Sequence, residues 1–386
     1  MKMAKIIVVG AGVGGVLMAN YLKDELLIFD ESTKHVHQPS WMYAGIYGKK
    51  ENTRAISDLL PKNATYKNEK IIKIDLANRI VYSKNAQYQY DKLIVASGSK
   101  PSPEKVTGLD TLSQKYGDIF TSEQQALKFW QNLNSFNGGK LVVGVSYPIY
   151  KFPPIALEAV FLIEEYLRKR KIRDKTKIFF FSPFTGAYPA KPMDDVIQPI
   201  LHEKGIELLA PFDLDTVDME KRILNSLEGD SLNFDLPLIV PPFTGTDAMP
   251  ENLVTEDGYI STDKQKLNIK GFEDAFAIGD VASIPSAKSG ATTHLEAKVL
   301  AKRLSGIDAK YDGRTNCPFE VGDRKATFVI GNYTTETAKI VPKRSYYYMK
   351  KFSGSIYWST IKGKYDWLYD WYFNYMNPKK MLEKYG

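Results

Sequence analysis

A glycine pattern near the amino terminus constrains the fold of this chain more than any other feature. The apolar run KIIVVG leads into GAGVGG, whose motif glycines are Gly10, Gly12 and Gly15, and a helical pattern follows. The next apolar run ends at Asp30. In this arrangement the first glycine permits a tight turn, the second lets backbone approach a pyrophosphate, and the third lets helix and strand pack closely. We therefore predict an α/β fold whose first domain binds a dinucleotide, with the acid placed to accept from a ribose hydroxyl.

Two later segments also have the pattern of buried strands, and they end in small or acidic residues. The first, YDKLIVASGSKP, carries Ser97 and Gly98, and the second, GFEDAFAIGDVA, carries Gly279 and Asp280. A carboxylate at the carboxyl end of a parallel strand points into the crevice where ligands bind, so Asp280 is a candidate binding residue. In the alternative interpretation, Asp280 caps the amino terminus of a following helix.

A second α/β unit is indicated in the middle of the chain. Strand patterns recur at 141–145, 177–182 and 234–242, with a helical pattern at about 155–170. The 386 residues also exceed the ~250–300 at which a single core stops growing. We predict two Rossmann-like domains and a C-terminal segment, with a discontinuous first domain at 1–103 and 247–312, a second domain at 104–246 and the segment at 313–386.

Aromatic residues gather among lysines after about residue 343, and the whole chain carries a formal charge of +7. Five of the residues there are predicted to share one helical stripe: Trp367, Leu368, Trp371, Tyr372 and Tyr375. Trp and Tyr favour the bilayer interface, and basic residues attract anionic headgroups. We expect this segment to contact an anionic membrane surface. In the alternative, its helix packs on the rest of the protein with the aromatic side chains as core.

The mode of membrane contact is also constrained. No window reaches the ~18–20 apolar residues of a spanning helix, so contact is expected at the surface only. The start of the chain lacks an apolar stretch followed by a cleavage site, so we do not expect secretion.

The three strand ends, in this order, resemble the signatures of FAD flavoproteins with two dinucleotide-binding domains. The resemblance spans residues 1–312 and implies FAD as the cofactor. It implies the following cofactor-binding residues: Gly10, Gly12, Gly15, Asp30, Ser97, Gly98, Gly279 and Asp280. In that family the acid that matches Asp280 binds the ribityl chain.

Within these flavoproteins, the chain resembles the family of sulfide:quinone oxidoreductase and flavocytochrome c sulfide dehydrogenase. YKFPPIALE is similar to the family's segment with a redox cysteine before Pro-Pro, but Phe152 stands in the place of that cysteine. NCPFEVGD retains the second cysteine as Cys317. PSAKSG, with Lys288 and Gly290, is similar to the helix entry near the flavin, and HVHQPSW is similar to the segment beside the isoalloxazine.

The single cysteine of the chain is a departure from this family. The usual oxidation of sulfide passes sulfur between two thiols, and one thiol cannot close that disulfide. The resemblance leaves Cys317 as the catalytic thiol on the donor side and Lys288 as a cation that stabilises negative charge near the flavin. In the alternative, Cys317 is a small buried apolar residue.

The loop after the strand at 141–145 bears on the electron donor. Relatives that oxidise a nicotinamide nucleotide usually carry a second GxGxxG there, whereas this loop has Gly144 alone. Pro148 also removes a backbone donor that a phosphate would need. Binding of NADH in the usual way is therefore disfavoured.

The resemblance implies a peripheral membrane enzyme on the cytoplasmic face, of the sulfide:quinone oxidoreductase type. It would pass electrons from a reduced donor through FAD to a membrane quinone held under the aromatic segment. Two alternatives are a type II NADH:quinone oxidoreductase with an atypical nucleotide loop and a flavin-bearing electron-transfer subunit that acts with a protein redox partner. No nucleic-acid-binding module is recognised, so we predict neither a nucleic-acid partner nor a metal site.

Overall fold

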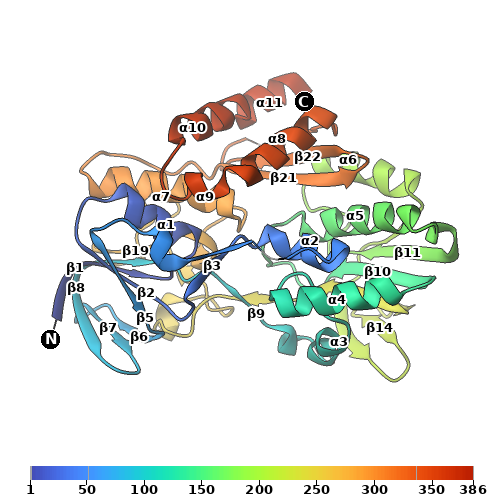
Figure 1. The fold of residues 1–386 in the computed structure, drawn as a ribbon, viewed down its shortest axis with the longest axis horizontal. Helices are drawn as coiled ribbons and strands as arrows, with labels where there is room; N and C mark the ends of the chain where they lie inside the picture. Colours follow the sequence, from blue (N-terminus) through green and yellow to red (C-terminus); the bar gives the residue numbers. More distant parts are fainter. Residues whose placement is uncertain (1, 51, 336, 386) are drawn as a thin grey trace.

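The chain folds into two α/β units that lie side by side under a set of C-terminal helices, in a computed structural model that describes residues 2–50, 52–335 and 337–385. Figure 1 shows the first sheet on the left and the second on the right, with the orange and red C-terminal elements above both. The predicted α/β class with two Rossmann-like units is confirmed.

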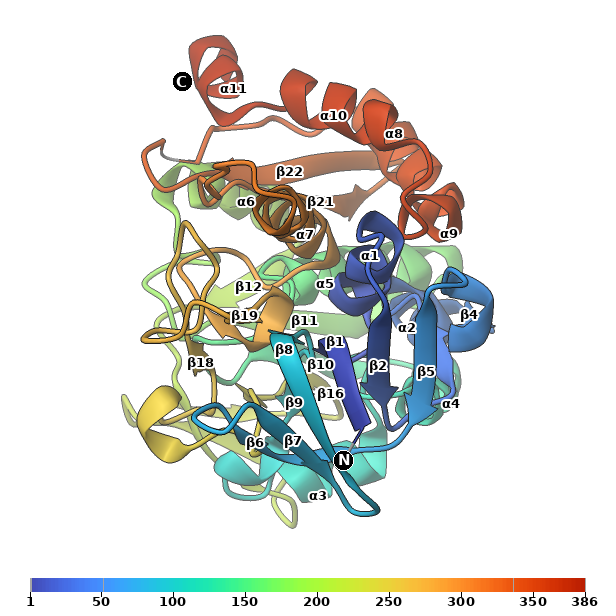
Figure 2. The same ribbon diagram turned by 90° about the vertical axis from the view of Figure 1, so that its left-hand side faces the viewer.

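The first sheet has seven strands in the order β5-β2-β1-β8-β7-β6, with β19 paired to β8. Five strands run parallel: β1 (Lys2–Val9), β2 (Leu26–Asp30), β5 (Ala64–Asn68), β8 (Gln87–Val95) and β19 (Ala275–Ala277). The hairpin β6 (Ile71–Asp75) and β7 (Ile80–Ser83) extends it antiparallel. Helices α1 (Val13–Tyr21) and α7 (Gly290–Leu304) pack against each other above the sheet (Figure 2).

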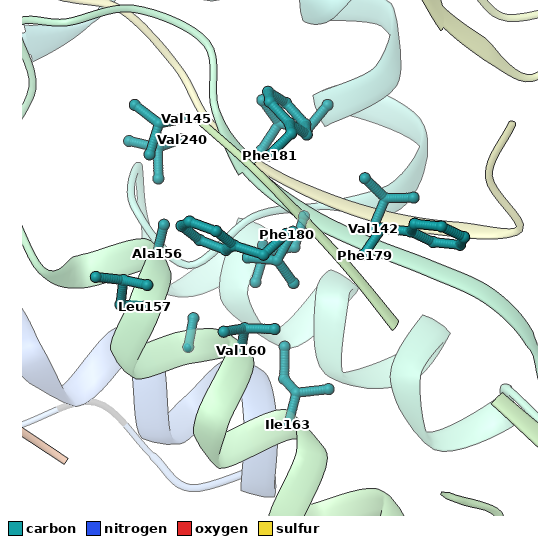
Figure 3. Packing of buried hydrophobic residues seen from close by; sticks show 14 of the residues in the cluster. Val142, Val145, Ala156, Leu157, Val160, Ile163, Phe179, Phe180, Phe181 and Val240 are labelled. Carbon is teal, nitrogen blue, oxygen red and sulfur yellow. The ribbon is translucent and has the colours of Figure 1, made fainter. Parts of the chain in front are cut away.

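The second sheet has four parallel strands in the order β12-β11-β10-β16. Its strands are β10 (Gly139–Val145), β11 (Thr176–Phe181), β12 (Ile206–Leu209) and β16 (Leu236–Val240). Its helices are α3 (Leu109–Tyr116), α4 (Glu123–Ser135), α5 (Ile155–Lys169) and α6 (Lys191–Glu203). Figure 3 shows Val160 of α5 beside Phe180 of β11, and both are fully buried. Burial of such a side chain contributes about 1.5–3 kcal/mol, so this contact fixes α5 and the loop before it.

Shorter elements accompany the two sheets. β9 (Lys100–Pro101) pairs with β17 (Phe243–Thr244) where the chain leaves the first sheet and where it returns. The other short strands are β3 (Lys34–Val36), β4 (Thr53–Ala55), β13 (Leu214–Asp218), β14 (Ile223–Ser226), β15 (Ser231–Asn233), β18 (Ile260–Ser261) and β20 (Ala282–Ser283). The remaining helical segments are α2 (Pro39–Tyr47), η1 (Ile56–Leu59), η2 (Pro103–Lys105), η3 (Arg173–Lys175), η4 (Glu251–Leu253) and η5 (Gly279–Val281).

The C-terminal region consists of a hairpin and four helices that cover both units (Figure 1). The elements are β21 (Thr315–Gly322), β22 (Lys325–Gly331), α8 (Arg344–Ser355), α9 (Tyr357–Thr360), α10 (Asp366–Tyr375) and α11 (Pro378–Tyr385). β21 packs on α5, and α8 packs on the hairpin. Among the described residues, no helix combines the length and the apolar character that are needed to cross a bilayer.

Candidate functional site

The glycine loop after β1 has a distinct steric requirement at each of its three glycines. Gly10 has φ +100°, and a Cβ there would collide with the carbonyl of Ala96. A Cβ on Gly15 would collide with the carbonyl oxygen of Gly10, so helix and turn touch closely. A Cβ on Gly12 would meet no atom within 4 Å. Gly12 therefore faces open space at the amino terminus of α1, where a phosphate group could approach.

Asp30 ends β2 beside this loop. One of its carboxylate oxygens accepts from the backbone N–H of Ala11 at 2.7 Å, and the other accepts from the N–H of Ser32 at 2.8 Å. Each carboxylate oxygen has lone pairs for more than one donor, so these bonds orient the group and leave acceptor capacity. The predicted ribose contact is compatible with this arrangement.

The predicted residues of the second and third strand ends lie next to the first loop. β8 and β19 pair in parallel through Val95 and Ala277, so Ser97 and Gly279 emerge from neighbouring strands at the same edge. Ser97 also contacts the loop, because a Cβ on Gly10 would lie 2.7 Å from the Cα of Ser97. Gly98 has φ +72° and open space on its Cβ side. The structure thus brings the three motifs to one edge, which is the usual ligand crevice of such sheets.

The side chain of Asp280 points toward the second unit. Its carboxylate forms an ion pair with the Lys151 ammonium at 3.5 Å, and both side chains are about 85% shielded, with 15% and 16% exposed. Asp280 lies within the short helix η5 (Gly279–Val281), whose N-cap residue is Ile278 and which has no side-chain cap. The alternative in which Asp280 acts as a helix cap is therefore wrong. Lys151 is a site residue that no sequence motif indicates; the only signal is its position beside Phe152 in YKFPP.

Lys288 lies on the other side of Asp280. Its Nζ donates to the carbonyl oxygens of Asp280 at 2.7 Å and Ala282 at 3.1 Å, and it lies 3.9 Å from the ring centre of Tyr259. Burial lowers the pKa of Lys288, and the Asp280 charge opposes that effect. Two carbonyl groups and the face of the Tyr259 ring thus surround the Lys288 ammonium.

Glu296 on α7 is a further polar group that sequence reasoning missed. Its carboxylate accepts from the backbone N–H of Gly279 at 2.6 Å and is 1% exposed. Burial raises its pKa to about 7. The only signal in the sequence is an acid within the small and apolar residues of α7, which does not reveal the N–H that it meets.

The two positions of the family's thiol pair contact the same dipeptide. Phe152 N–H donates to the carbonyl oxygen of Lys288 at 2.8 Å, and Phe152 has φ +49°, which is rare for a bulky residue. The Cys317 thiol lies 3.6 Å from the Ser289 hydroxyl. The cysteine is 1% exposed, and burial raises its pKa to about 12. The thiol is therefore protonated at neutral pH, which favours the alternative of a buried apolar residue in the wild type.

The loop after β10 differs from the loop after β1. A Cβ on Gly144 would collide with the ring of Phe181, and Ser146 donates through both its N–H and its hydroxyl to the carbonyl oxygen of Val240. The neighbouring strand β11 ends at Phe181 and is followed by Ser182, where the first unit has an acid. The second unit therefore has neither the open phosphate loop nor the ribose acid of the first.

Two cavities open on either side of residues 286–287. One has a volume of about 360 Å³ and extends past Ile149 and Asp257, and the other has about 650 Å³ and extends past Lys191 and Thr337. Both are lined by Pro153, Ser286 and Ala287. Pro153 is the residue after Phe152, and Lys288 also lines the smaller cavity, so this cavity lies beside the dipeptide that Phe152 and Cys317 contact.

A buried cluster of charges ties α8 to the second unit. Lys350 forms an ion pair with Glu158 of α5, and Lys351 lies 2.8 Å from Glu320 of β21. The Tyr43 hydroxyl donates to Glu320 at 2.5 Å. Two lysines thus face two carboxylates, and burial, with the neighbouring charge of Lys351, lowers the pKa of Lys350.

Two aspartates of helix α10 contact α1 and α7, and three of its aromatic residues are exposed. Asp366 accepts from the Tyr21 hydroxyl at 3.0 Å, and Asp370 pairs with Lys298 of α7 at 2.6 Å. Trp367 and Trp371 are 70% and 58% exposed. We call the outward row formed by Trp367, Trp371 and Tyr375 the aromatic face.

The predicted single stripe on this helix is wrong. Tyr372 donates to Asn316 at 3.2 Å and packs with the hairpin core, on a different side from Trp367. Tyr372 is five positions after Trp367, and at about 100° per residue it lies about 140° from Trp367 around the helix axis. Phe373 is buried, as in the alternative in which aromatic side chains form core, while the aromatic face is solvent-exposed. Contact of this face with a membrane stays a prediction.

Comparisons with known proteins agree with this geometry. A family model described as pyridine nucleotide-disulphide oxidoreductase matches residues 4–297. The mitochondrial sulfide:quinone oxidoreductase of Dictyostelium discoideum is 26% identical, with 94% of this chain and 87% of the relative covered.

Two solved structures have a similar fold. The sulfide:quinone oxidoreductase of Aquifex aeolicus superimposes with a TM-score of 0.80 at 19% identity, covering 94% of this chain and 92% of the other. NDH2 of Plasmodium falciparum in complex with NADH has a TM-score of 0.68 at 13% identity, with coverage of 92% and 99%.

Proposed function

The chain belongs to the pyridine nucleotide-disulphide oxidoreductase family, and on that premise we propose that it is an FAD-dependent oxidoreductase of the sulfide:quinone oxidoreductase type. It passes electrons from a reduced donor to a membrane quinone. The observation that carries the proposal is that Phe152 and Cys317 both contact the Lys288–Ser289 dipeptide, so the places of the thiol pair persist although one thiol is missing.

The loop glycines and the strand ends fit FAD. The open space beside Gly12 accepts a pyrophosphate that a Cβ would exclude, and Asp30 is oriented to accept from a ribose hydroxyl. Asp280, held by Lys151, lies at the edge where the ribityl chain would pass. FAD, when bound, supplies a group that can take two electrons and release them to a quinone. The ammonium groups of Lys288 and Lys151 would stabilise negative charge at that edge.

The donor side differs from that of a two-thiol enzyme. Phe152 cannot form a sulfur bond, and the protonated Cys317 is a poor nucleophile. We propose that the wild type transfers little sulfur by the usual route and that Cys317 and Lys288 retain their catalytic positions. NADH is disfavoured as the donor because the loop after β10 has Gly144 alone, which packs against the Phe181 ring, and because the N–H of Ser146 is engaged by Val240.

The acceptor side is assigned to the C-terminal region. The aromatic face, with nearby lysines, would rest in the headgroup region of an anionic membrane, predicted above to be the cytoplasmic face. A quinone in that membrane would then approach the protein beside the C-terminal helices.

The test is anaerobic reduction of the purified flavoprotein, followed by its flavin absorbance. Sulfide should bleach the wild type slowly, and the Phe152→Cys variant should bleach faster and reduce a short-chain quinone. The double variant Phe152→Cys/Cys317→Ser is the matched control, and it should lose the gain.

Two outcomes would contradict the proposal. Rapid bleaching of the wild type by NADH, reversed by quinone, would select the NADH:quinone oxidoreductase. A flavin that neither donor reduces in the wild type or in Phe152→Cys would indicate an electron-transfer subunit that depends on a protein partner.

A further inference from the structure

We infer that the C-terminal region completes the dinucleotide site, with Tyr357 and His35 as positioning residues of the glycine loop, so that binding of FAD and docking of α9 stabilise each other. The inference rests on the proposed binding of FAD. It goes beyond that proposal because it assigns the C-terminal region a role in cofactor binding as well as in membrane contact.

A chain of three hydrogen bonds connects α9 to the ribose acid. The Tyr357 hydroxyl lies 2.6 Å from Nε2 of His35, and Nδ1 of His35 lies 2.9 Å from the carbonyl oxygen of Ala11. The N–H of Ala11 donates to Asp30 at 2.7 Å. The backbone N–H and the carbonyl oxygen of Ala11, the residue before Gly12, are therefore both held by hydrogen bonds.

The neighbours of His35 determine its hydrogen positions. The carbonyl oxygen of Ala11 can only accept, so Nδ1 carries the hydrogen, and Nε2 must accept from the Tyr357 hydroxyl. His35 is 4% exposed, and burial lowers its pKa, which favours the neutral ring. Without the hydroxyl of Tyr357, the buried Nε2 would lack a partner in this arrangement.

Packing holds α9 against the loop-bearing helix. Trp358 forms a buried cluster with Val16 of α1, and its ring N–H donates to Asn52 at 2.9 Å. The ring of His37 lies 4.2 Å from the ring of Tyr357. These contacts fix Tyr357 above His35, although the two residues are 322 positions apart in the chain.

Linkage makes this arrangement reciprocal. If α9 restrains Ala11 and Gly12 in the conformation that binds a pyrophosphate, FAD binds more tightly when α9 is docked. The coupling free energy is the same in both directions, so bound FAD must stabilise the docked state of α9 by the amount that docking stabilises bound FAD. The cofactor-loaded protein should therefore hold its C-terminal helices more firmly than the apoprotein does.

The experiment measures FAD dissociation constants and hydrogen exchange on the full chain. Tyr357→Phe keeps the aromatic packing and removes only the hydroxyl, so FAD binding should weaken by roughly fivefold, the contribution of one neutral hydrogen bond. Tyr365→Phe is the matched control, because Tyr365 is exposed in the same region, and it should bind like the wild type. In the wild type, FAD should slow amide exchange across residues 356–361, and this effect should shrink in Tyr357→Phe.

His35→Gln gives a second variant, and thermal unfolding of each apoprotein checks that it is folded. If wild type, Tyr357→Phe and His35→Gln bind FAD equally and FAD does not alter exchange at 356–361, the inference is wrong while the proposed function stands. A wild type that binds no FAD would refute both.

Discussion

The thiol of Cys317 lies 3.6 Å from the hydroxyl of Ser289, and only 1% of the cysteine is exposed. Burial raises the pKa of Cys317 to about 12; the charge of Asp280 adds to the rise, and the hydrogen bond to Ser289 opposes it. A thiol in this environment behaves as a small apolar side chain until something exposes it.

We predict that a thiol-specific disulfide reagent modifies the folded protein slowly at pH 8. The thiolate fraction is lower by on the order of a thousandfold than for an ordinary cysteine, and the buried sulfur is also shielded from the reagent. The absorbance of the released thiol measures the rate, with guanidinium-unfolded protein as the control. Complete labelling of the folded protein at the rate of the unfolded one would contradict this account of Cys317.

Gly12→Val should abolish or strongly weaken FAD binding, by about tenfold or more, because its side chain would fill the space that a pyrophosphate needs. The measurement is the flavin content of the purified protein. Gly354→Val is the matched control, since a Cβ at Gly354 also meets no atom within 4 Å but lies in α8. Full flavin occupancy in Gly12→Val would place the phosphate site elsewhere.

Gly12 could be predicted from the sequence as a binding residue, whereas Lys151 could not. The glycine motif is local, and each glycine has the steric role that its spacing predicts. The Lys151–Asp280 pair joins two units through the packing of α5 on its sheet, and no local pattern encodes that distance. The pairing of His35 with Tyr357 is equally remote.

The aromatic face illustrates another limit. Periodicity identifies which residues of α10 lie near one another, but it does not say which side meets the protein. The orientation of α10 follows from the contacts of Asp366 with Tyr21 of α1 and of Asp370 with Lys298 of α7. The two tryptophans are then left outside.

The buried carboxyl group of Glu296 should make stability depend on pH. Its pKa is raised to about 7 in the folded protein, so between about pH 4.5 and 7 the native state holds a proton that the unfolded state has lost. Stability therefore falls as pH rises through this window, by roughly 3 kcal/mol for this group. Urea unfolding of the apoprotein at pH 5 and pH 8 should show the loss, and Glu296→Gln should reduce it. If the free energy of unfolding depends on pH identically in wild type and variant, groups other than Glu296 cause the effect.

The double change Trp367→Ser/Trp371→Ser should weaken association with anionic vesicles by about tenfold or more. Burying half of one aromatic side chain in the membrane contributes about 1 kcal/mol to binding, and the variant lacks two such side chains. Cosedimentation with vesicles of mixed neutral and anionic lipids measures the effect. Leu227→Ser is the control, because Leu227 is 67% exposed on the hairpin of the second unit. If the tryptophan variant and the wild type sediment equally, the aromatic face does not contribute to membrane binding.

The most direct test of the central claim is the reoxidation of the chemically reduced flavoprotein by a quinone. The protein is loaded with FAD, reduced under anaerobic conditions by light or by a stoichiometric reductant, and mixed with a short-chain ubiquinone in the presence of anionic vesicles. This measurement does not depend on the identity of the natural donor. We predict that the oxidised flavin spectrum returns at an enzymatic rate of about 1 s⁻¹ or faster. A flavin that stays reduced in the presence of excess quinone would contradict the assignment of this chain as a quinone-reducing oxidoreductase.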